Sequence, residues 1–223
     1  MTAESKTDRM FRIYNEFHLV CDSARFRKLF SRVELFRLIA DLPGDIIDAG
    51  AFKGISTLQF AHLIETYKPN SRTKVLSFDT FDATMPGARE DEKEGVASLM
   101  EQYESTAYEV LANTLKEQNL ESRVKLIQGD VISTMPAYFD KNPGCRISLL
   151  HCDLDIYAPT LVTLETVWPR IVPGGVIVFD EYAIEEWGES DAVDEFFATL
   201  DKPPRLRSLP HSSTPTAYCI KGD

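Results

Sequence analysis

Residues 45–54 read Asp45-Ile46-Ile47-Asp48-Ala49-Gly50-Ala51-Phe52-Lys53-Gly54. Their first half is a short apolar run of the kind that forms a buried strand, and the glycines that follow predict a turn. From Ser56 to Tyr67, apolar residues return at helical spacing. The stretch is therefore expected to fold as a strand, a glycine turn and a helix, which is the repeating unit of an α/β protein.

The same alternation continues along the rest of the chain. Further strands are predicted at residues 74–79, 123–128, 146–152 and 176–179, and further helices at 24–41, 96–118, 160–170 and 192–200. Residues 205–209 and 216–220 are expected to form a closing antiparallel hairpin. Together these elements predict a doubly wound, mostly parallel α/β sheet that binds its ligands at the carboxyl ends of the strands.

Length and composition fit one soluble domain with an ordinary core. The chain has 223 residues, of which 43% are hydrophobic and 26% are charged. No apolar run approaches the roughly 18 residues of a membrane span, and the polar N-terminus does not resemble a signal peptide. We therefore expect a cytoplasmic protein without a membrane partner.

Charge and cysteine spacing disfavour two other classes of site. The net charge of −11 disfavours a nucleic-acid partner, because binding to phosphates requires a positive face. A local group of basic residues, Arg25, Arg27, Lys28 and Arg32, is interpreted as the solvated side of a helix. The four cysteines are far apart and include no CxxC pair, so neither a disulfide framework nor a zinc knuckle is supported.

Two parts of the chain lie outside the predicted sheet. Residues 1–41 are expected to form an N-terminal helical segment, and residues 42–223 the ligand-binding domain. Apolar side chains of the first segment, such as Phe11 and Phe17, could cover a ligand pocket or form the contact of a homodimer. Residues 81–95 carry a proline, a glycine and several acidic side chains, so they are expected to form either a mobile lid over the site or a solvated insertion.

The glycine turn is the first candidate binding site. Its glycines, Gly50 and Gly54, match neither the GxGxxG pattern of dinucleotide-binding proteins nor the GxxxxGK[ST] pattern of P-loops. Glycine lets a ligand approach the backbone, and the helix that follows offers its N-terminus. Asp48, two residues before the first glycine, favours a cationic ligand with an amino-acid end, and S-adenosylmethionine is such a ligand.

Two more aspartates follow predicted strands. Asp79 could accept hydrogen bonds from the ribose hydroxyls of such a ligand, and Asp130 could receive the adenine amino group. One strand-end aspartate could equally cap the next helix, but three on consecutive strands favour a cofactor site. The candidate donor-binding residues are Asp48, Gly50, Ala51, Phe52, Gly54, Ser56, Asp79 and Asp130.

Two acidic clusters follow the fourth and fifth predicted strands. They are His151-Cys152-Asp153-Leu154-Asp155 and Phe179-Asp180-Glu181. Because parallel strands end at the same edge of a sheet, three or four carboxylates are expected to meet there. Crowded carboxylates raise one another's pKa unless a positive charge lies between them, which predicts a hard divalent cation.

A set of motifs occurs in a characteristic order over most of the chain. They are Leu42-Pro43-Gly44-Asp45, Asp48-Ala49-Gly50-Ala51-Phe52-Lys53-Gly54, Phe78-Asp79-Thr80-Phe81, Asp153-Leu154-Asp155-Ile156-Tyr157, Pro173-Gly174-Gly175, Asp180-Glu181-Tyr182 and Ala192-Val193-Asp194-Glu195-Phe196. Taken together, the set resembles the macrocin O-methyltransferase-like family, whose members methylate sugar hydroxyls of natural products. The resemblance runs from about Arg32 to Phe197.

The resemblance implies a class I methyltransferase fold, S-adenosylmethionine as methyl donor, and Mg²⁺ or another divalent cation. It also implies a small hydroxylated acceptor, such as the sugar of a natural product or of another glycosylated metabolite. Asp153, Asp180 and Glu181 match the family's metal ligands by position. Two departures are visible: Asp180-Glu181 stands where the family has two consecutive aspartates, and Asp153-Leu154-Asp155 stands where it has Asp-Gly-Asp.

The general base stays open at this point. More distant, catechol-type metal-dependent methyltransferases have a lysine three residues after the first aspartate, where this chain has Ile156. Asp153 or Asp155 is then the candidate base. His151 is a further candidate, although a histidine after an apolar run is more often a satisfied core residue.

Two alternatives keep the predicted fold. One is a metal-independent methyltransferase that uses Asp155 or His151 as base, and the other is a catalytically silent binding or scaffold protein. An NAD-dependent oxidoreductase is disfavoured because the GxGxxG pattern is missing.

Overall fold

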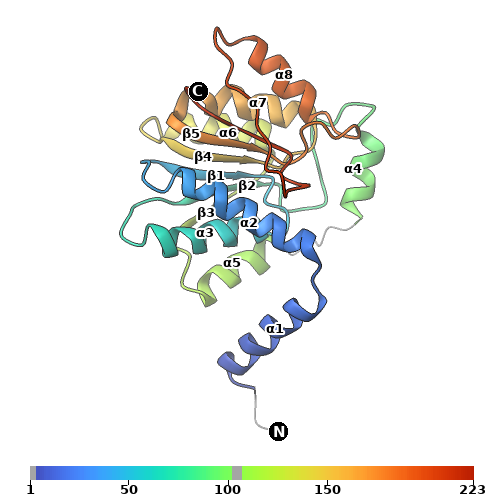
Figure 1. The fold of residues 1–223 in the computed structure, drawn as a ribbon. Coiled ribbons are helices and arrows are strands. Elements are labelled where there is room, and N and C mark those ends of the chain that lie inside the picture. Colours follow the sequence, from blue (N-terminus) through green and yellow to red (C-terminus); the bar gives the residue numbers. More distant parts are fainter. Residues whose placement is uncertain (1–3, 102–106) are drawn as a thin grey trace.

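The computed structural model describes residues 4–101 and 107–223. The strands in this part of the chain are β1 (Asp45–Ala49), β2 (Val75–Asp79), β3 (Val124–Gln128), β4 (Ile147–Cys152), β5 (Ile171–Phe179) and β6 (Ala217–Ile220). They form one sheet in the order β3-β2-β1-β4-β5-β6 (Figure 1). β1 to β5 are parallel, and β6 runs antiparallel to β5. The predicted α/β fold class is confirmed.

Helices cover both faces of this sheet. The helices in the described part of the chain are α1 (Lys6–Val20), α2 (Ser23–Leu38), α3 (Ile55–Tyr67), α4 (Lys93–Met100), α5 (Ala107–Glu117), α6 (Val131–Lys141), α7 (Tyr157–Val167), the 3₁₀ helix η1 (Trp168–Arg170) and α8 (Glu189–Ala198). α2, α3 and α5 lie on one face, and α6, α7 and α8 lie on the other (Figure 1). None of the described helices is both long and apolar enough to span a membrane.

Each face of the sheet has its own apolar core. One core includes Phe36 and Phe60 from α2 and α3, and the other includes Phe139 and Phe197 from α6 and α8. Within β1, Ile46 packs into the first core and Ile47 into the second, because successive side chains of a strand point to opposite faces. Both faces are covered, which is why the strands read as unbroken apolar runs.

The structure differs from the prediction in two helical segments. The single helix predicted at 96–118 is divided into α4 and α5, and the residues between them, 102–106, lie outside the described part of the chain. α6 is absent from the sequence-based prediction. Its buried residues Val131 and Met135 do recur at helical spacing, but Pro136 lies inside the helix, and a proline normally marks a helix end.

The predicted C-terminal hairpin is only partly correct. Its second strand is β6, which pairs with β5. Residues 205–209 do not form a strand, and they contact β6 through one antiparallel bridge between Arg207 and Tyr218. Prolines on both sides of this segment lack the amide hydrogen that a ladder needs. β5 is longer than predicted, because it begins at Ile171.

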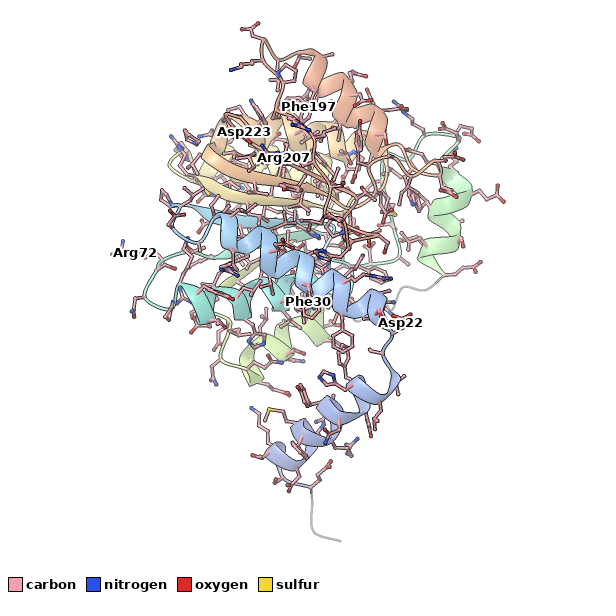
Figure 2. All side chains as sticks on the ribbon, viewed as in Figure 1. Asp22, Phe30, Arg72, Phe197, Arg207 and Asp223 are labelled. Carbon is pink, nitrogen blue, oxygen red and sulfur yellow. The ribbon has the colours of Figure 1, made fainter. Side chains whose placement is uncertain are left out.

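The N-terminal helix α1 lies apart from the sheet (Figures 1 and 2). This helix, which is described in full, buries none of its side chains. It contacts α2 through aromatic rings, and the ring centroids of Phe17 and Phe26 are 5.3 Å apart. Asp22, labelled in Figure 2, begins α2 by accepting a hydrogen bond from the amide of Ala24. The N-terminal segment therefore consists of α1, which buries none of its side chains, and α2, which packs on the sheet.

Candidate functional site

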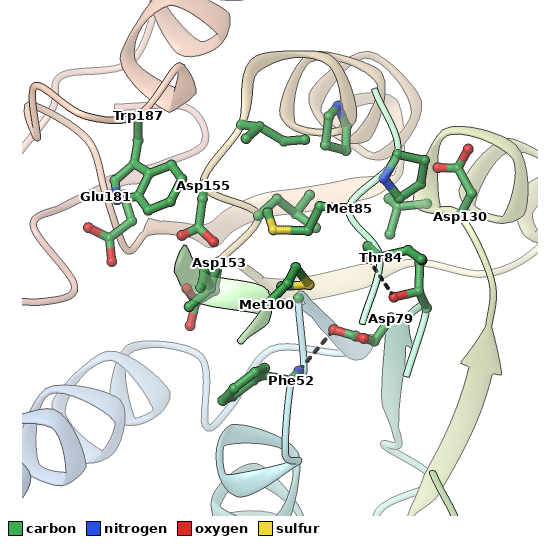
Figure 3. Close-up of a pocket in the computed structure, with 18 of the residues that line it drawn as sticks. Phe52, Asp79, Thr84, Met85, Met100, Asp130, Asp153, Asp155, Glu181 and Trp187 are labelled. Carbon is green, nitrogen blue, oxygen red and sulfur yellow. Dashed lines mark hydrogen bonds between the residues drawn. The ribbon is translucent and has the colours of Figure 1, made fainter. Parts of the chain in front are cut away.

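A pocket of about 300 Å³ opens at the carboxyl ends of the parallel strands (Figure 3). Gly50 and Phe52 of the turn after β1 line it, together with Asp79 at the end of β2 and Asp130 after β3. Carboxylates from the ends of β4 and β5 line another side. Its further lining includes Lys28, Thr84, Met85, Pro86, Leu99, Met100, Asp153, Asp155, Ile156, Glu181 and Trp187. The glycine turn and both acidic clusters thus meet at one edge of the sheet.

Gly50 lies where the turn after β1 touches the end of β4. Its φ is +86°, and a Cβ atom built on it would lie 1.6 Å from the carbonyl oxygen of Asp153. A side chain at position 50 is therefore excluded both by the left-handed backbone and by the neighbouring strand. Gly54, which begins α3, has φ +81°, and its Cβ would lie 2.6 Å from Leu111. Glycine at position 50 therefore keeps the turn close to the acidic cluster, and glycine at position 54 leaves room for Leu111 of α5.

Asp79 holds the glycine turn in place. Its Oδ2 accepts a hydrogen bond of 2.9 Å from the amide of Phe52 (Figure 3). Its Oδ1 accepts one of 2.7 Å from the amide of Phe81. Phe52 has a positive φ of 49°, and Ala51 beside it is buried. One carboxylate thus fixes two backbone segments while lining the pocket.

Asp48 and Ser56 are not among the described residues that line the pocket. Asp48 is fully buried, and its Oδ2 accepts hydrogen bonds from the hydroxyls of Ser56, at 2.8 Å, and Thr57. Its Oδ1 lies 2.9 Å from Nδ1 of His151. Burial would raise the pKa of Asp48, but these hydrogen bonds and the charge of His151 lower it below its usual value. Asp48 is placed as a support beneath the turn.

Asp130 lines the pocket and also caps a helix. Its Oδ1 accepts a hydrogen bond of 2.9 Å from the amide of Ile132 at the start of α6. The structural role considered for strand-end aspartates is therefore present here. A carboxylate has further lone pairs, so capping and ligand binding do not exclude each other.

Three carboxylates form the acidic wall of the pocket. Asp153, Asp155 and Glu181 each offer an oxygen, and these oxygens lie within 4.8 Å of one another (Figure 3). Burial and repulsion from Asp180 raise the pKa of Asp153 and of Glu181, each to about 7. Burial and the charge of Asp153 raise the pKa of Asp155 well above its usual value. Such a group needs a positive partner or a proton.

A second group lies deeper and consists of His151, Asp153 and Asp180. Each of these residues has one ligand atom within 4.8 Å of those of the other two. Asp180 is fully buried, and its Oδ1 lies 3.6 Å from Nε2 of His151, which is too long for a hydrogen bond. Neither of these two atoms has a hydrogen-bond partner among the described residues. Burial would lower the pKa of His151, but Asp180 and Asp48 raise it to about 9. The two neighbouring carboxylates thus favour the protonated form of His151.

Lys28 enters this group from α2. Its Nζ lies 2.9 Å from Oδ2 of Asp180, and its side chain also lines the pocket. Burial would raise the pKa of Asp180, but His151 and Lys28 lower it below its usual value. The interpretation of the basic residues of α2 as a solvated face is therefore wrong for Lys28 and also for Arg32, which is buried. It is correct for Arg25 and Arg27, which are exposed.

The spacing of buried residues along α2 indicates that Lys28 faces inward. Lys28 lies three, four and seven residues before Ser31, Arg32 and Leu35, all of which are buried. Positions related in this way share one face of a helix. The helix therefore directs Lys28 inward, along the face that packs on the sheet.

The segment at 81–95 is tied to the domain at its far end. The buried carboxylate of Glu92 accepts hydrogen bonds from the amide of Tyr157, at 2.8 Å, and from that of Arg89, at 2.7 Å. The Arg89 guanidinium lies 3.4 Å from the ring centroid of Tyr157 and pairs with Asp191 at 2.8 Å. Between these anchors and β2, the segment contributes several pocket-lining residues.

Glu189 is a further residue that sequence reasoning did not single out. It is fully buried at the start of α8, and its Oε1 accepts a hydrogen bond of 2.9 Å from the amide of Glu181. Its own amide donates to the carbonyl oxygen of Asp155 at 3.0 Å. Glu189 therefore holds the backbone of two acidic residues of the pocket.

The order of the strands and the pocket at their carboxyl edge define the architecture of the class I methyltransferases. The sequence model of the macrocin O-methyltransferase (TylF) family matches residues 17–202. The chain belongs to this family.

The curated relatives are named as O-methyltransferases. The chain is 28% identical over 178 residues to 8-demethyl-8-(2,3-dimethoxy-alpha-L-rhamnosyl)-tetracenomycin-C 4'-O-methyltransferase of Streptomyces olivaceus, covering 73% of the chain and 66% of the relative. It is 26% identical over 174 residues to mycinamicin III 3''-O-methyltransferase of Micromonospora griseorubida, covering 72% and 66%. The match thus spans slightly less than two thirds of the length of each relative.

Solved structures agree with the fold. The crystal structure of the calicheamicin methyltransferase CalS11 is 26% identical, with a TM-score of 0.81 over 100% of this chain and 95% of that chain. The O-methyltransferase NovP is 19% identical, with a TM-score of 0.72 over 88% of this chain and 80% of that chain, and shows the same fold.

Proposed function

We propose that this chain is an S-adenosylmethionine-dependent O-methyltransferase that acts on a hydroxyl of a small acceptor, a sugar of a natural product or of another glycosylated metabolite. The observation that carries the proposal is the contact between Gly50 and Asp153, which places the glycine turn and the acidic cluster in one pocket. The names of the curated relatives support the reaction and the acceptor class.

The donor half of the site is assigned to the turn and its neighbours. Gly50 and Phe52 line the pocket where the amino-acid end of the donor would bind, and Asp79 and Asp130 line the side where its ribose and adenine would lie. The sulfonium of the donor makes its methyl group electrophilic. In the transfer the methyl–sulfur bond breaks while a bond to the acceptor oxygen forms, and the hydroxyl proton must be accepted nearby.

The residues at the acidic wall suit a hard divalent cation. Asp180 has a fully buried oxygen with no hydrogen-bond partner among the described residues, and the raised pKa values of Asp153 and Glu181 report repulsion that a cation would relieve. We assign Asp153, Asp180 and Glu181 as the residues that would hold Mg²⁺. When bound, the ion would supply Lewis acidity toward the acceptor hydroxyl.

The proton of the acceptor is assigned to a carboxylate of the acidic wall. Asp153 and Asp155 line the pocket, so their carboxylates can face an acceptor hydroxyl and accept its proton. His151 does not line the described pocket, and both of its ring nitrogens face buried carboxylates. We therefore favour Asp155 or Asp153 over His151 as the general base.

The acceptor half is assigned to the apolar side of the pocket. Met85, Met100 and Trp187 face the space beside the carboxylates (Figure 3). Two methionines and an indole provide a large, adaptable apolar surface. Such a surface fits an acceptor that carries an apolar group beside its hydroxyl, and we propose that residues 81–95 cover it.

Calorimetry with S-adenosylmethionine and methyl transfer to a panel of hydroxylated acceptors test the proposal. We expect donor binding, transfer to sugar hydroxyls, loss of turnover with EDTA, and recovery with Mg²⁺. A chain that binds no donor would contradict the proposed reaction. Turnover that is insensitive to EDTA would contradict only the role of the metal.

One observation favours the metal-independent alternative. Lys28 already supplies a positive charge to Asp180, at 2.9 Å. In a metal-independent enzyme, Asp155 would act as base without an ion. The EDTA experiment separates the metal-dependent reaction from the metal-independent one.

A further inference from the structure

We propose that Lys28 is a displaceable cation of the acidic site, which competes with a divalent metal ion for Asp180 and thereby sets the metal affinity of the chain. The inference rests on the metal-binding half of the proposed function. It concerns a residue of α2, which lies 152 positions from Asp180 in sequence.

The first observation is that Lys28 and a metal ion would need the same carboxylate. Nζ of Lys28 lies 2.9 Å from Oδ2 of Asp180. One oxygen of Asp180 also lies within 4.8 Å of an oxygen of Asp153, which is near enough for both carboxylates to contact one ion. Divalent ions bind carboxylate oxygens at about 2.0–2.6 Å, so an ion on Asp180 would stand close to the ammonium group. Two cations in one buried site repel each other strongly.

The second observation is that Lys28 is partly exposed whereas Asp180 is fully buried. The side chain of Lys28 is 29% exposed, and that of Asp180 is 0% exposed. The amide of Asp180 is held by the carbonyl oxygen of Cys152 at the end of β4. Lys28 reaches the site on a flexible four-carbon stem and borders the open pocket. When an ion binds, the ammonium group can therefore move into the pocket while the carboxylate stays.

The third observation is that the site offers two groups of ligands. Asp153, Asp155 and Glu181 form one group, which does not contain the partner of Lys28, whereas Asp153 and Asp180 belong to a second group, which does. Recruitment of Asp180 as a ligand thus requires release of Lys28. Removing the ammonium group makes this recruitment easier.

The direct test is calorimetric titration with Mn²⁺ or Mg²⁺, without donor or acceptor, at fixed ionic strength. We expect Lys28→Met to bind the ion about tenfold more tightly than the unaltered chain, because the ion no longer displaces a buried partner of Asp180. The matched control is Arg27→Met, which removes one exposed positive charge from the same helix and should change the affinity by less than about twofold.

Equal or weaker metal binding by Lys28→Met, relative to the unaltered chain, would overturn the inference, and so would a failure of both proteins to bind the ion. Neither result concerns donor binding or methyl transfer, which are measured separately with S-adenosylmethionine. A failure of the inference is therefore distinguishable from a failure of the proposed reaction.

A second measurement uses only the unaltered chain, so it does not depend on how a variant folds. Lysine amines are acetylated at low reagent excess, and the rate at Lys28 is compared by mass spectrometry with that at the exposed Lys202. We expect Mg²⁺ to increase the rate ratio of Lys28 to Lys202, since the displaced amine faces the pocket. An unchanged or lower ratio at saturating ion would overturn the inference.

Discussion

His151 is a buried histidine whose charged form is favoured by two neighbouring carboxylates. Its ring lies between Asp48 and Asp180, all three side chains are fully buried, and its pKa is raised from 6.5 to about 9. A basic group whose pKa is raised by folding stabilises the native state below the unfolded pKa and loses that contribution as the pH rises through the folded value. The contribution of His151 is therefore complete below about pH 6.5 and is lost toward pH 9.

The upward shift of the His151 pKa leads to a prediction about stability. We expect the difference in free energy of unfolding between the unaltered chain and His151→Gln to be largest below pH 6.5 and to shrink toward pH 9. Urea denaturation at a series of pH values measures it. His62→Gln, at an exposed histidine, is the control and should give a difference that is small at every pH. A His151 difference that grows with pH would contradict the favoured protonation of His151.

Asp153 is the residue on which the proposed chemistry depends most. Its carboxylate belongs to both ligand groups and lines the pocket, whereas its contact with Gly50 is made by the backbone carbonyl. We expect Asp153→Asn to lower turnover by about 100- to 10,000-fold while the calorimetric affinity for S-adenosylmethionine stays unchanged. Asp140→Asn, at an exposed position of α6, is the control and should keep full turnover. Full turnover in Asp153→Asn would contradict the assignment of Asp153 as a metal ligand or general base.

Sequence pattern predicts some of these residues and misses others for a physical reason. The acidic residues are recognisable because they follow apolar runs that can only be buried strands. Lys28 is part of the same site, but its partner lies on another element, and no local pattern encodes that pairing. The support given by Glu189 to Glu181 likewise depends on how α8 packs.

Among the elements, the turn after β1 is tightly restricted at Gly50, both in backbone conformation and in the space for a side chain. Gly50 combines a φ of +86° with the backbone of Asp153 directly in the space of a Cβ atom, whereas Gly222 has a φ of +100° and no neighbour within 4 Å. We expect Gly50→Ala to lower the free energy of unfolding by about 3 kcal/mol or more and Gly222→Ala by only about 1 kcal/mol. Urea denaturation compares them. Equal losses would show that β4 can yield to the turn.

The element at 81–95 is expected to depend on Glu92 for its anchorage. The carboxylate of Glu92 accepts two backbone hydrogen bonds and is buried, whereas Glu94 is exposed. We expect Glu92→Ala to speed amide hydrogen exchange in residues 84–91 and to raise KM for the acceptor. Glu94→Ala should leave both unchanged. Unaltered exchange in Glu92→Ala would mean that the segment is held by its other contacts.

Sequence reasoning is most reliable for the buried strands and least reliable for the helices beside the site. The parallel strands are covered on both faces, so their apolar runs are distinctive. The region from α4 to α5 contains no glycine or proline after Gly95 to mark a helix end. The end of α5 is instead marked by Asn119, whose φ is 57° and after which the amide of Leu120 donates to the carbonyl oxygen of Leu115.

At the scale of the whole molecule, α1 contributes no buried side chain to the domain. Phe11 and Leu19 are 67% and 85% exposed, and none of the described pocket-lining residues belongs to α1. Of the two roles predicted for the N-terminal segment, a homodimer contact fits α1 better than a pocket cover within one chain. Apolar surface of this kind is normally covered by a partner.

We therefore expect the protein to be a dimer in solution and Phe11→Ser to shift it toward the monomer. Size-exclusion chromatography with light scattering at several concentrations measures the mass. Arg9→Ser, on the same helix, is the control and should leave the dimer intact. A protein that is monomeric at every concentration would exclude this role of α1.

The contact of Gly50 with Asp153 also has a consequence for engineering. A designer who wishes to give this scaffold a new acceptor cannot reshape the end of β4, because any shift there also moves the turn assigned to the donor. Met85, Met100 and Trp187 belong to segments that do not share this contact. Libraries confined to those three positions should therefore change which molecule is modified while leaving the reactive geometry as it is.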